Sequence, residues 1–147
     1  MTTARSLCAQ KGVRLTELRE QVLNLIWQSH KPLGAYELME QLARETTRRV
    51  APPTVYRALE FLLEQGLVHR INSLNAYVGC THPRQEHATN FLICRHCGVA
   101  IEFASVPLES SLQASADELG FVIEAHSIEV VGSCKRCTDQ GVASHEH

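Results

Sequence analysis

The N-terminal part of this chain lacks a run of apolar residues long enough for a signal peptide or a membrane-spanning helix. This absence favours a cytoplasmic protein that makes no contact with a membrane. In a reducing cytosol, cysteines are more often free thiols or metal ligands than partners in disulfides. The six cysteines of the chain are therefore candidates for metal binding.

Aromatic residues are scarce, at 5% of the 147 residues, whereas 44% of the residues are hydrophobic and 20% are charged. This balance is typical of a globular protein, and the length permits one ordinary domain or two small ones. A small domain with few aromatic side chains has a modest apolar core. Such a domain gains stability from a metal ion that crosslinks the chain.

Four of the cysteines form two pairs with the same spacing, Cys94 with Cys97 and Cys134 with Cys137. Each pair places two thiolates on one tight turn, and two such turns together supply four sulfur ligands for a structural zinc. Gly98 directly after the first pair favours this interpretation, because glycine readily adopts the positive φ that closes a metal-binding turn. Two disulfides or a redox-active pair are the alternatives, and the lack of a secretory signal favours zinc over both.

The charge is divided unequally between the two halves of the chain. Residues 1–72 carry ten Lys and Arg against seven Asp and Glu, whereas residues 73–147 carry four against nine. A basic N-terminal half is able to face nucleic acid, which would repel the acidic half.

The N-terminal half shows helical periodicity followed by a hairpin pattern. Thr16 is a candidate N-cap for the first helix, and Gly66 is a natural C-terminal stop for the third. Pro52 and Pro53 suit the entry into that third helix, where no amide donor is needed. The expected helices span residues 16–29, 35–45 and 54–65, and the expected strands span residues 67–71 and 76–80. Three helices followed by a β-hairpin describe a winged helix-turn-helix.

The C-terminal half predicts a small α+β unit of a different kind. Strands are expected over residues 90–94, 99–103 and 121–131, and a helix over residues 105–119. A unit of this size is expected to dimerise as well as to bind metal. The expected fold class is therefore α+β, with a winged-helix domain over residues 1–80, a hinge or metal loop over residues 81–90 and a small α/β dimerisation domain over residues 91–147.

The third helix carries the candidate DNA-binding residues. In a helix-turn-helix, side chains near the N-terminus of the recognition helix reach base edges in the major groove, and here these are Thr54, Tyr56 and Arg57. Arginine can bind guanine through two hydrogen bonds, and tyrosine and threonine can contact phosphate or a thymine methyl group. Tyr36 is a further phosphate candidate that could equally be packed. The competing interpretation is an ordinary amphipathic surface helix.

Several motifs in one order resemble the ferric uptake regulator family. They are the sequence PTVYRAL at residues 53–59, Gly66-Leu67-Val68, and the two cysteine pairs. The resemblance extends from about residue 4 to residue 137 and is strongest to the zinc-sensing branch of the family. It implies a winged helix and an α/β dimerisation domain joined by a hinge. It also implies a homodimeric transcription repressor that binds palindromic, AT-rich operators on double-stranded DNA when loaded with metal.

The resemblance further implies a second, regulatory zinc site in each protomer. Its ligands would be His69 and Cys80 in the wing, His87 in the following loop and Glu102 after the first cysteine pair. A thiolate at residue 80 itself favours zinc, because iron-sensing relatives use nitrogen and oxygen donors. With the four-cysteine site, this predicts two Zn²⁺ ions per protomer. A further peripheral site would use His82, Glu124 and His126.

We expect no enzymatic activity and no small-molecule substrate. A catalytic zinc needs an open coordination position, and both predicted sites have four protein donors. A redox cysteine pair normally accompanies a βαβ pattern, which neither pair shows. The expected function is repression of zinc-uptake genes when zinc is plentiful. The runner-up is a regulator of the same family that senses ferrous iron or peroxide.

Overall fold

A computed structural model describes residues 2–45, 49–80 and 88–140 of the chain. The chain divides into two compact units, residues 1–84 and 85–147, and the division falls inside the interval predicted as a hinge. The domain boundaries themselves stay a prediction. Across the described residues, no helix combines the length and the apolar character needed to cross a membrane.

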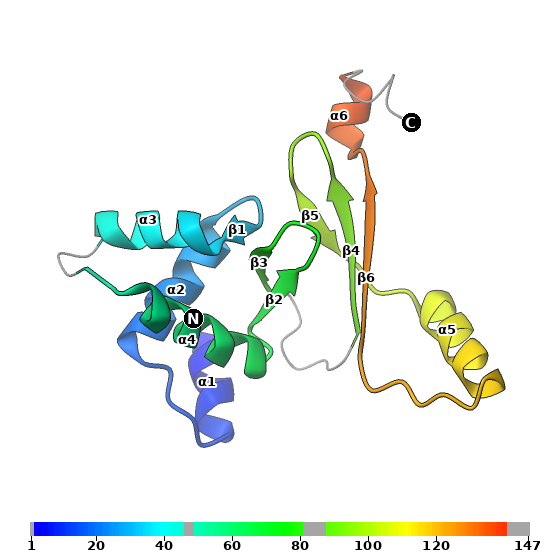
Figure 1. Ribbon diagram of the computed structural model, residues 1–147, viewed down its shortest axis with the longest axis horizontal. Coiled ribbons are helices and arrows are strands. Elements are labelled where there is room, and N and C mark those ends of the chain that lie inside the picture. Colours follow the sequence, from blue (N-terminus) through cyan, green and yellow to red (C-terminus); the bar gives the residue numbers. More distant parts are fainter. Residues whose placement is uncertain (1, 46–48, 81–87, 141–147) are drawn as a thin grey trace. The chain divides into compact units, whose positions relative to one another are not determined.

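The first unit contains the predicted helices and hairpin, together with two elements that the sequence pattern did not reveal. The helices are α1 (Thr2–Gln10), α2 (Glu17–Gln28), α3 (Ala35–Glu45) and α4 (Pro52–Glu64), and the strands are β1 (Leu33–Gly34), β2 (Val68–Ile71) and β3 (Ala76–Gly79). The helix predicted over residues 35–45 is confirmed to the residue. Helix α1 and strand β1 were missed. Figure 1 shows the helices grouped beside the β2–β3 hairpin, as in a winged helix-turn-helix.

Local chemistry explains where the helices begin and end. The Thr16 side chain accepts a hydrogen bond from the backbone N–H of Arg19, so the predicted N-cap of α2 is confirmed. Helix α4 begins at Pro52, two residues earlier than predicted, because proline is well tolerated in a first turn. It ends before Gly66, whose φ of 71° is a conformation that glycine adopts easily.

The apolar faces of α2, α3 and α4 meet in one core. Each helix contributes side chains that are at most 3% exposed, and β2 and β3 close the core through Val68 and Tyr77. The inward side chains of the three helices include Val22, Leu23, Leu38, Leu42, Val55, Leu59 and Leu62. Because Val55, Leu59 and Leu62 form the buried face of α4, the polar side chains on its other face point away from the core.

The β2–β3 hairpin is the wing of the winged helix-turn-helix. Its register assigns each of its residues to one of two faces. In the antiparallel β2–β3 ladder, Val68 is opposite Gly79 and His69 is opposite Val78, while β1 pairs with the other edge of β3. Directly opposed residues project to the same face, and successive residues alternate. His69 and Cys80 therefore share one face of the wing, and Gly79 lies on the other.

The second unit is a three-stranded sheet with one long helix. Its elements are β4 (Ala88–Cys94), β5 (Ala100–Glu102), α5 (Val106–Glu118), β6 (His126–Gly132) and α6 (Lys135–Asp139). The strand order is β5-β4-β6, with β4 antiparallel to β5 and parallel to β6. Helix α5 lies between β5 and β6 along the chain (Figure 1) and begins after Ser105, whose side chain accepts the N–H of Leu108.

The last strand is shorter than its sequence suggests. The pattern predicted a strand over residues 121–131, whereas β6 spans His126–Gly132. Phe121 and Val122 are 65% and 81% exposed and belong to the connection that follows α5. The apolar residues at 121–125 thus resemble a strand in composition, but they do not pair with a neighbouring strand.

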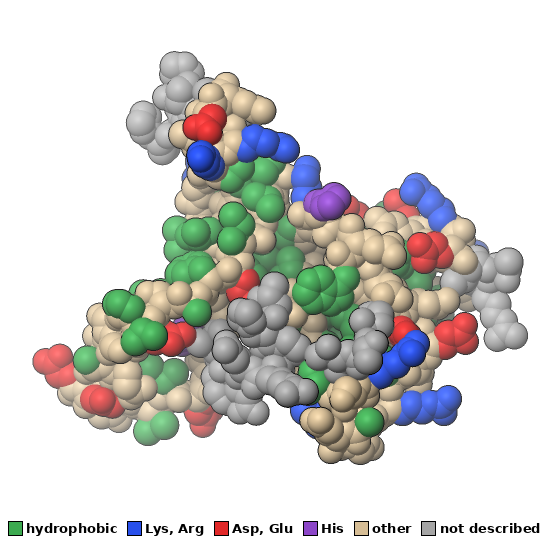
Figure 2. All heavy atoms as spheres, turned by 180° about the vertical axis from the view of Figure 1, so that it is seen from behind, with side chains coloured by type: hydrophobic (Ala, Val, Ile, Leu, Met, Phe, Trp, Pro, Cys, Tyr) green, Lys and Arg blue, Asp and Glu red, His purple; other side chains and the backbone are tan. Residues whose placement is uncertain are grey.

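Many apolar side chains of the second unit are exposed. Ala116 is the buried residue of α5. Leu92, Ile101 and Val130 on the sheet are each between 44% and 49% exposed. Figure 2 shows hydrophobic side chains gathered over these strands. An apolar patch of this kind on a folded unit is typical of a surface that another protein covers.

Candidate metal centres and DNA-binding surface

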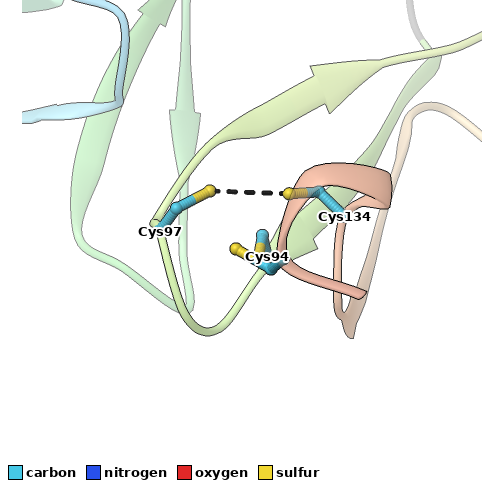
Figure 3. A group of neighbouring side chains, drawn as sticks. Cys94, Cys97 and Cys134 are labelled. Atoms are coloured by element: carbon cyan, nitrogen blue, oxygen red, sulfur yellow. Dashed lines mark hydrogen bonds between the residues drawn. The ribbon is translucent and has the colours of Figure 1, made fainter. Parts of the chain in front are cut away.

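The two cysteine pairs come together in the second unit. Cys94 ends β4, Cys97 lies in the turn before β5, Cys134 is the N-cap of α6 and Cys137 lies within α6. Their four sulfur atoms all lie within 4.8 Å of one another. The Sγ atoms of Cys97 and Cys134 point toward each other at 3.7 Å (Figure 3).

These distances fit a tetrahedral zinc. Zn–S bonds of about 2.3 Å place two sulfurs of a tetrahedron about 3.8 Å apart. A disulfide would need a separation of about 2 Å, and the four cysteines are free thiols in this structure. With four sulfur donors converging, no coordination position is left for a substrate, which is the arrangement of a structural site.

Backbone hydrogen bonds hold both cysteine turns in place. In the first turn, the N–H of Gly98 donates to the carbonyl of Cys94 at 3.0 Å, and Gly98 has a φ of 78°. The predicted role of this glycine is therefore confirmed. The N–H of Arg95 donates to the carbonyl of Gly132 at 2.9 Å, which ties the first turn to the end of β6. The second pair follows β6 directly, so the sheet itself brings the two turns together.

The electrostatics of the cluster favour the thiolate form of Cys94 and oppose that of Cys137. Backbone N–H groups of Cys97 and Cys134 lower the pKa of the Cys94 thiol to about 5. Burial, followed by hydrogen bonds with the neighbouring sulfurs, raises the pKa of the Cys137 thiol to about 12. The shifts differ in sign because Cys94 receives the N–H donors, whereas Cys137 is buried beside sulfurs that gain negative charge. A divalent cation removes this conflict, since thiolates are the metal-binding form of cysteine.

A second pair of metal donors lies on the wing. His69 and Cys80 project from the same face of the hairpin, and a ring nitrogen of His69 lies within 4.8 Å of the Cys80 sulfur. The Cys80 N–H donates to the carbonyl of Leu67 at 3.0 Å, which extends the hairpin by one residue pair beyond β3. Cys80 is 4% exposed. One nitrogen and one sulfur at this spacing are suitable ligands for zinc.

The other predicted ligands of the regulatory site do not belong to the first unit. Glu102 ends β5 in the second unit, where it is half-buried opposite Phe91 of β4. His87 lies outside the described residues, as does His82 of the predicted peripheral site. The regulatory set of four ligands therefore stays a prediction, of which the first unit contributes the His69–Cys80 pair.

His126 has a polar partner that sequence reasoning missed. Its Nε2 lies 3.2 Å from Oδ1 of Asn90, a side chain that is 1% exposed in β4. The amide nitrogen of Asn90 donates to the carbonyl of Phe103 at 3.3 Å. Asn90 was the detectable signal, because an asparagine inside a strand needs a polar partner when it is buried. Glu124 is exposed, and the peripheral site stays a prediction.

The candidate DNA-binding side chains are exposed on the first unit. Thr54, Tyr56 and Arg57 lie on the outer face of α4, and Tyr56 is 48% exposed. Tyr36, near the start of α3, is 77% exposed, so it is not packed in the core of this unit. Three of these side chains lie in the N-terminal half of α4, and Tyr36 lies in the first turn of α3.

Comparison with known proteins agrees with this architecture. The model of the ferric uptake regulator family matches residues 10–131. The zinc uptake regulation protein of Escherichia coli K12 is 38% identical over 146 residues, which cover 99% of this chain and 85% of the relative. That of Mycobacterium tuberculosis H37Rv is 32% identical over 129 residues, with 86% and 95% covered. A solved zinc uptake regulator in complex with zinc and DNA is 39% identical, covers 96% of this chain and 94% of its own, and has a TM-score of 0.89.

Removal of metal should unfold the second unit selectively. Its buried apolar side chains are few, and the four-sulfur cluster joins α6 to the β4–β5 turn. We expect a strong chelator to abolish amide-exchange protection in β4–β6 while α2–α4 stay protected, as measured by hydrogen exchange with mass spectrometry. Cys97→Ser should reproduce this result without chelator. Protection of β4–β6 that survives complete metal removal would contradict a structural metal.

Proposed function

Because this chain belongs to the ferric uptake regulator family, we propose that it is a zinc-responsive transcriptional repressor. The observation that carries this proposal is the His69–Cys80 pair, a nitrogen and a sulfur donor on the wing of a DNA-binding unit. Repression of zinc-uptake genes when zinc is plentiful is the expected output, and two relatives named zinc uptake regulation proteins support it. A regulator of this kind works beside the bacterial chromosome, hence in the cytoplasm.

Each protomer is proposed to hold two zinc ions with different tasks. The four-cysteine cluster holds the structural ion, which keeps the second unit folded. The regulatory ion is held by His69, Cys80, His87 and Glu102, a set of one sulfur, two nitrogen and one oxygen donors that suits tetrahedral zinc. Cys80 disfavours the runner-up, a sensor of ferrous iron or peroxide, because a thiolate is a soft ligand suited to zinc.

The regulatory ligands come from different parts of the chain, and this suggests the mechanism. His69 and Cys80 belong to the first unit, His87 to the predicted hinge and Glu102 to the second unit. Zinc supplies a single centre that all four donors must reach at once. When they do, the hinge has one angle; when they do not, it samples many. The DNA-competent angle is then thinly populated, and apparent affinity for DNA falls by that fraction.

The proposed active species is a homodimer on a palindromic, AT-rich operator. The exposed apolar residues of the second unit, Leu92, Ile101 and Val130 among them, are suited to contact with a second copy. In a two-fold dimer, the hinge angle sets the separation of the two recognition helices, which must match the spacing of the half-sites. Tyr36, Thr54, Tyr56 and Arg57 are the proposed contacts to DNA. A relative solved with zinc and DNA supports this proposal.

The Cys80→Ser variant should distinguish the two proposed zinc sites, because it should lose one zinc ion and keep the other. The variant should keep one tightly bound zinc per protomer and lose the second, because it retains the four-cysteine cluster and lacks the wing sulfur. Its operator affinity at saturating zinc should fall by about 5- to 150-fold, the usual range of allosteric coupling. Fluorescence anisotropy with a labelled operator and buffered free zinc measures the affinity, and mass spectrometry under native conditions counts the ions. A variant that still responds to zinc would exclude Cys80 as a regulatory ligand.

Arg57→Ala should relax sequence discrimination. If the guanidinium reads a base, its removal should cost about 1–3 kcal/mol on the cognate operator and much less on a sequence altered at the contacted base. Arg44→Ala is the control, since Arg44 is an exposed arginine near the end of α3 and its removal changes the charge equally. A loss with Arg57→Ala that is equal on all sequences and shrinks as salt is raised would identify a phosphate contact instead.

A further inference from the structure

The single tryptophan of the chain, Trp27, lies in an unusual place for so large an apolar side chain. It is the second-last residue of α2 and is 49% exposed, so it contributes little to the core of the first unit. Its ring nevertheless lies against one residue of the wing, Gly79. Neither residue belongs to the metal-ligand or DNA-contact sets proposed above.

The contact between ring and glycine is too close for any other residue. A Cβ atom added to Gly79 would lie 2.4 Å from Cε2, 2.7 Å from Cδ2 and 2.8 Å from Cζ2 of Trp27. All three distances are shorter than nonbonded carbon atoms tolerate. Gly79 does not have a positive φ, so its backbone conformation does not itself require glycine. The indole ring is the reason that this position has no side chain.

The ring lies behind the metal donors. Gly79 is opposite Val68 in the hairpin, on the face that turns toward the helices, while His69 and Cys80 project from the other face. Gly79 also directly precedes Cys80. An unsupported glycine at the end of a strand is conformationally free, and an aromatic ring packed over a strand glycine restricts it.

We infer that Trp27 is a positioning residue for the regulatory metal site. The indole packs on the back of the strand at Gly79 and keeps the Cys80 sulfur within reach of a metal ion held by His69. This inference rests on the proposed function, since it assumes that the wing donors bind zinc. It adds that α2, an element without metal donors, determines how well they do so.

A double-mutant cycle tests the inference. Trp27→Ala should weaken zinc binding at the wing by about 10- to 100-fold, as is usual for residues that orient metal ligands. Gly79→Ala should also weaken it, because the new methyl group displaces the ring. In the double variant, Gly79→Ala should have no further effect, because its harm depends on the indole. Trp27→Phe should retain most of the affinity, and Gln28→Ala, an exposed neighbour on α2, should behave as wild type.

The measurement must distinguish positioning from general loss of stability. The four-cysteine cluster is first filled with zinc, and Co²⁺ is then titrated as the probe of the second site. Absorption from charge transfer between sulfur and Co²⁺ reports coordination by Cys80. Urea unfolding of each variant, followed by circular dichroism, provides the stability. Weaker Co²⁺ binding without an equal loss of stability supports positioning, as does a change of Trp27 emission when Co²⁺ binds to the wild-type protein.

Three results would overturn the inference, and they have two different meanings. If wild type binds a second ion and Trp27→Ala binds it equally well, the indole has no positioning role and the proposed regulatory site stands. The same conclusion follows if Gly79→Ala is equally harmful with and without the indole. If wild type binds no second ion at all, the regulatory site itself is wrong, and the inference falls with it.

Discussion

The convergence of four sulfur atoms is the interaction on which the second unit depends. This unit has a short three-stranded sheet, and the buried residue of its long helix is an alanine. Hydrophobic burial within a single copy is therefore small, and the stabilising contribution must come from other sources. A metal ion held by the four sulfurs would join the β4–β5 turn to α6, and a second copy is able to cover the exposed apolar face. Folding, metal binding and association are thus linked in this half of the chain.

The first unit is stabilised in a different way, by a larger apolar core. Its core is apolar and extensive enough to hold α4 rigidly, so the recognition helix needs no metal to keep its shape. The wing belongs to this unit and carries two ligands of the proposed regulatory zinc site. Alternation along β2 and β3 places Val68 and Tyr77, which close the helical core, on one face of the hairpin. His69 and Cys80 lie on the other face, which they share with the buried Ile71 and Ala76. The same short hairpin therefore closes the core of the first unit and also carries two of the proposed zinc ligands.

Most of the first unit could be predicted because its signals are local. Thr16 bonds to a backbone group three residues away, and Gly66 adopts its own positive φ, so the ends of α2 and α4 follow from adjacent residues. The elements that were missed or misplaced depend on distant partners. Strand β1 consists of two residues and exists only because β3 lies beside it. Conversely, residues 121–125 have a strand-like composition but no partner, and they stay outside the sheet.

The candidate sites also combine features that follow from local sequence with features that depend on contacts between distant residues. The sequence alone determined the four-cysteine metal site and the outward face of the recognition helix, because cysteine spacing and helical periodicity act within a few residues. It also supplied donors for a second zinc site. Only the tertiary structure decided that His69 and Cys80 share a face within 4.8 Å, that Asn90 bonds to His126, and that Trp27 lies on Gly79. Each of these contacts joins different elements, and strand register and helix packing, which determine them, are properties of the whole unit rather than of any short segment.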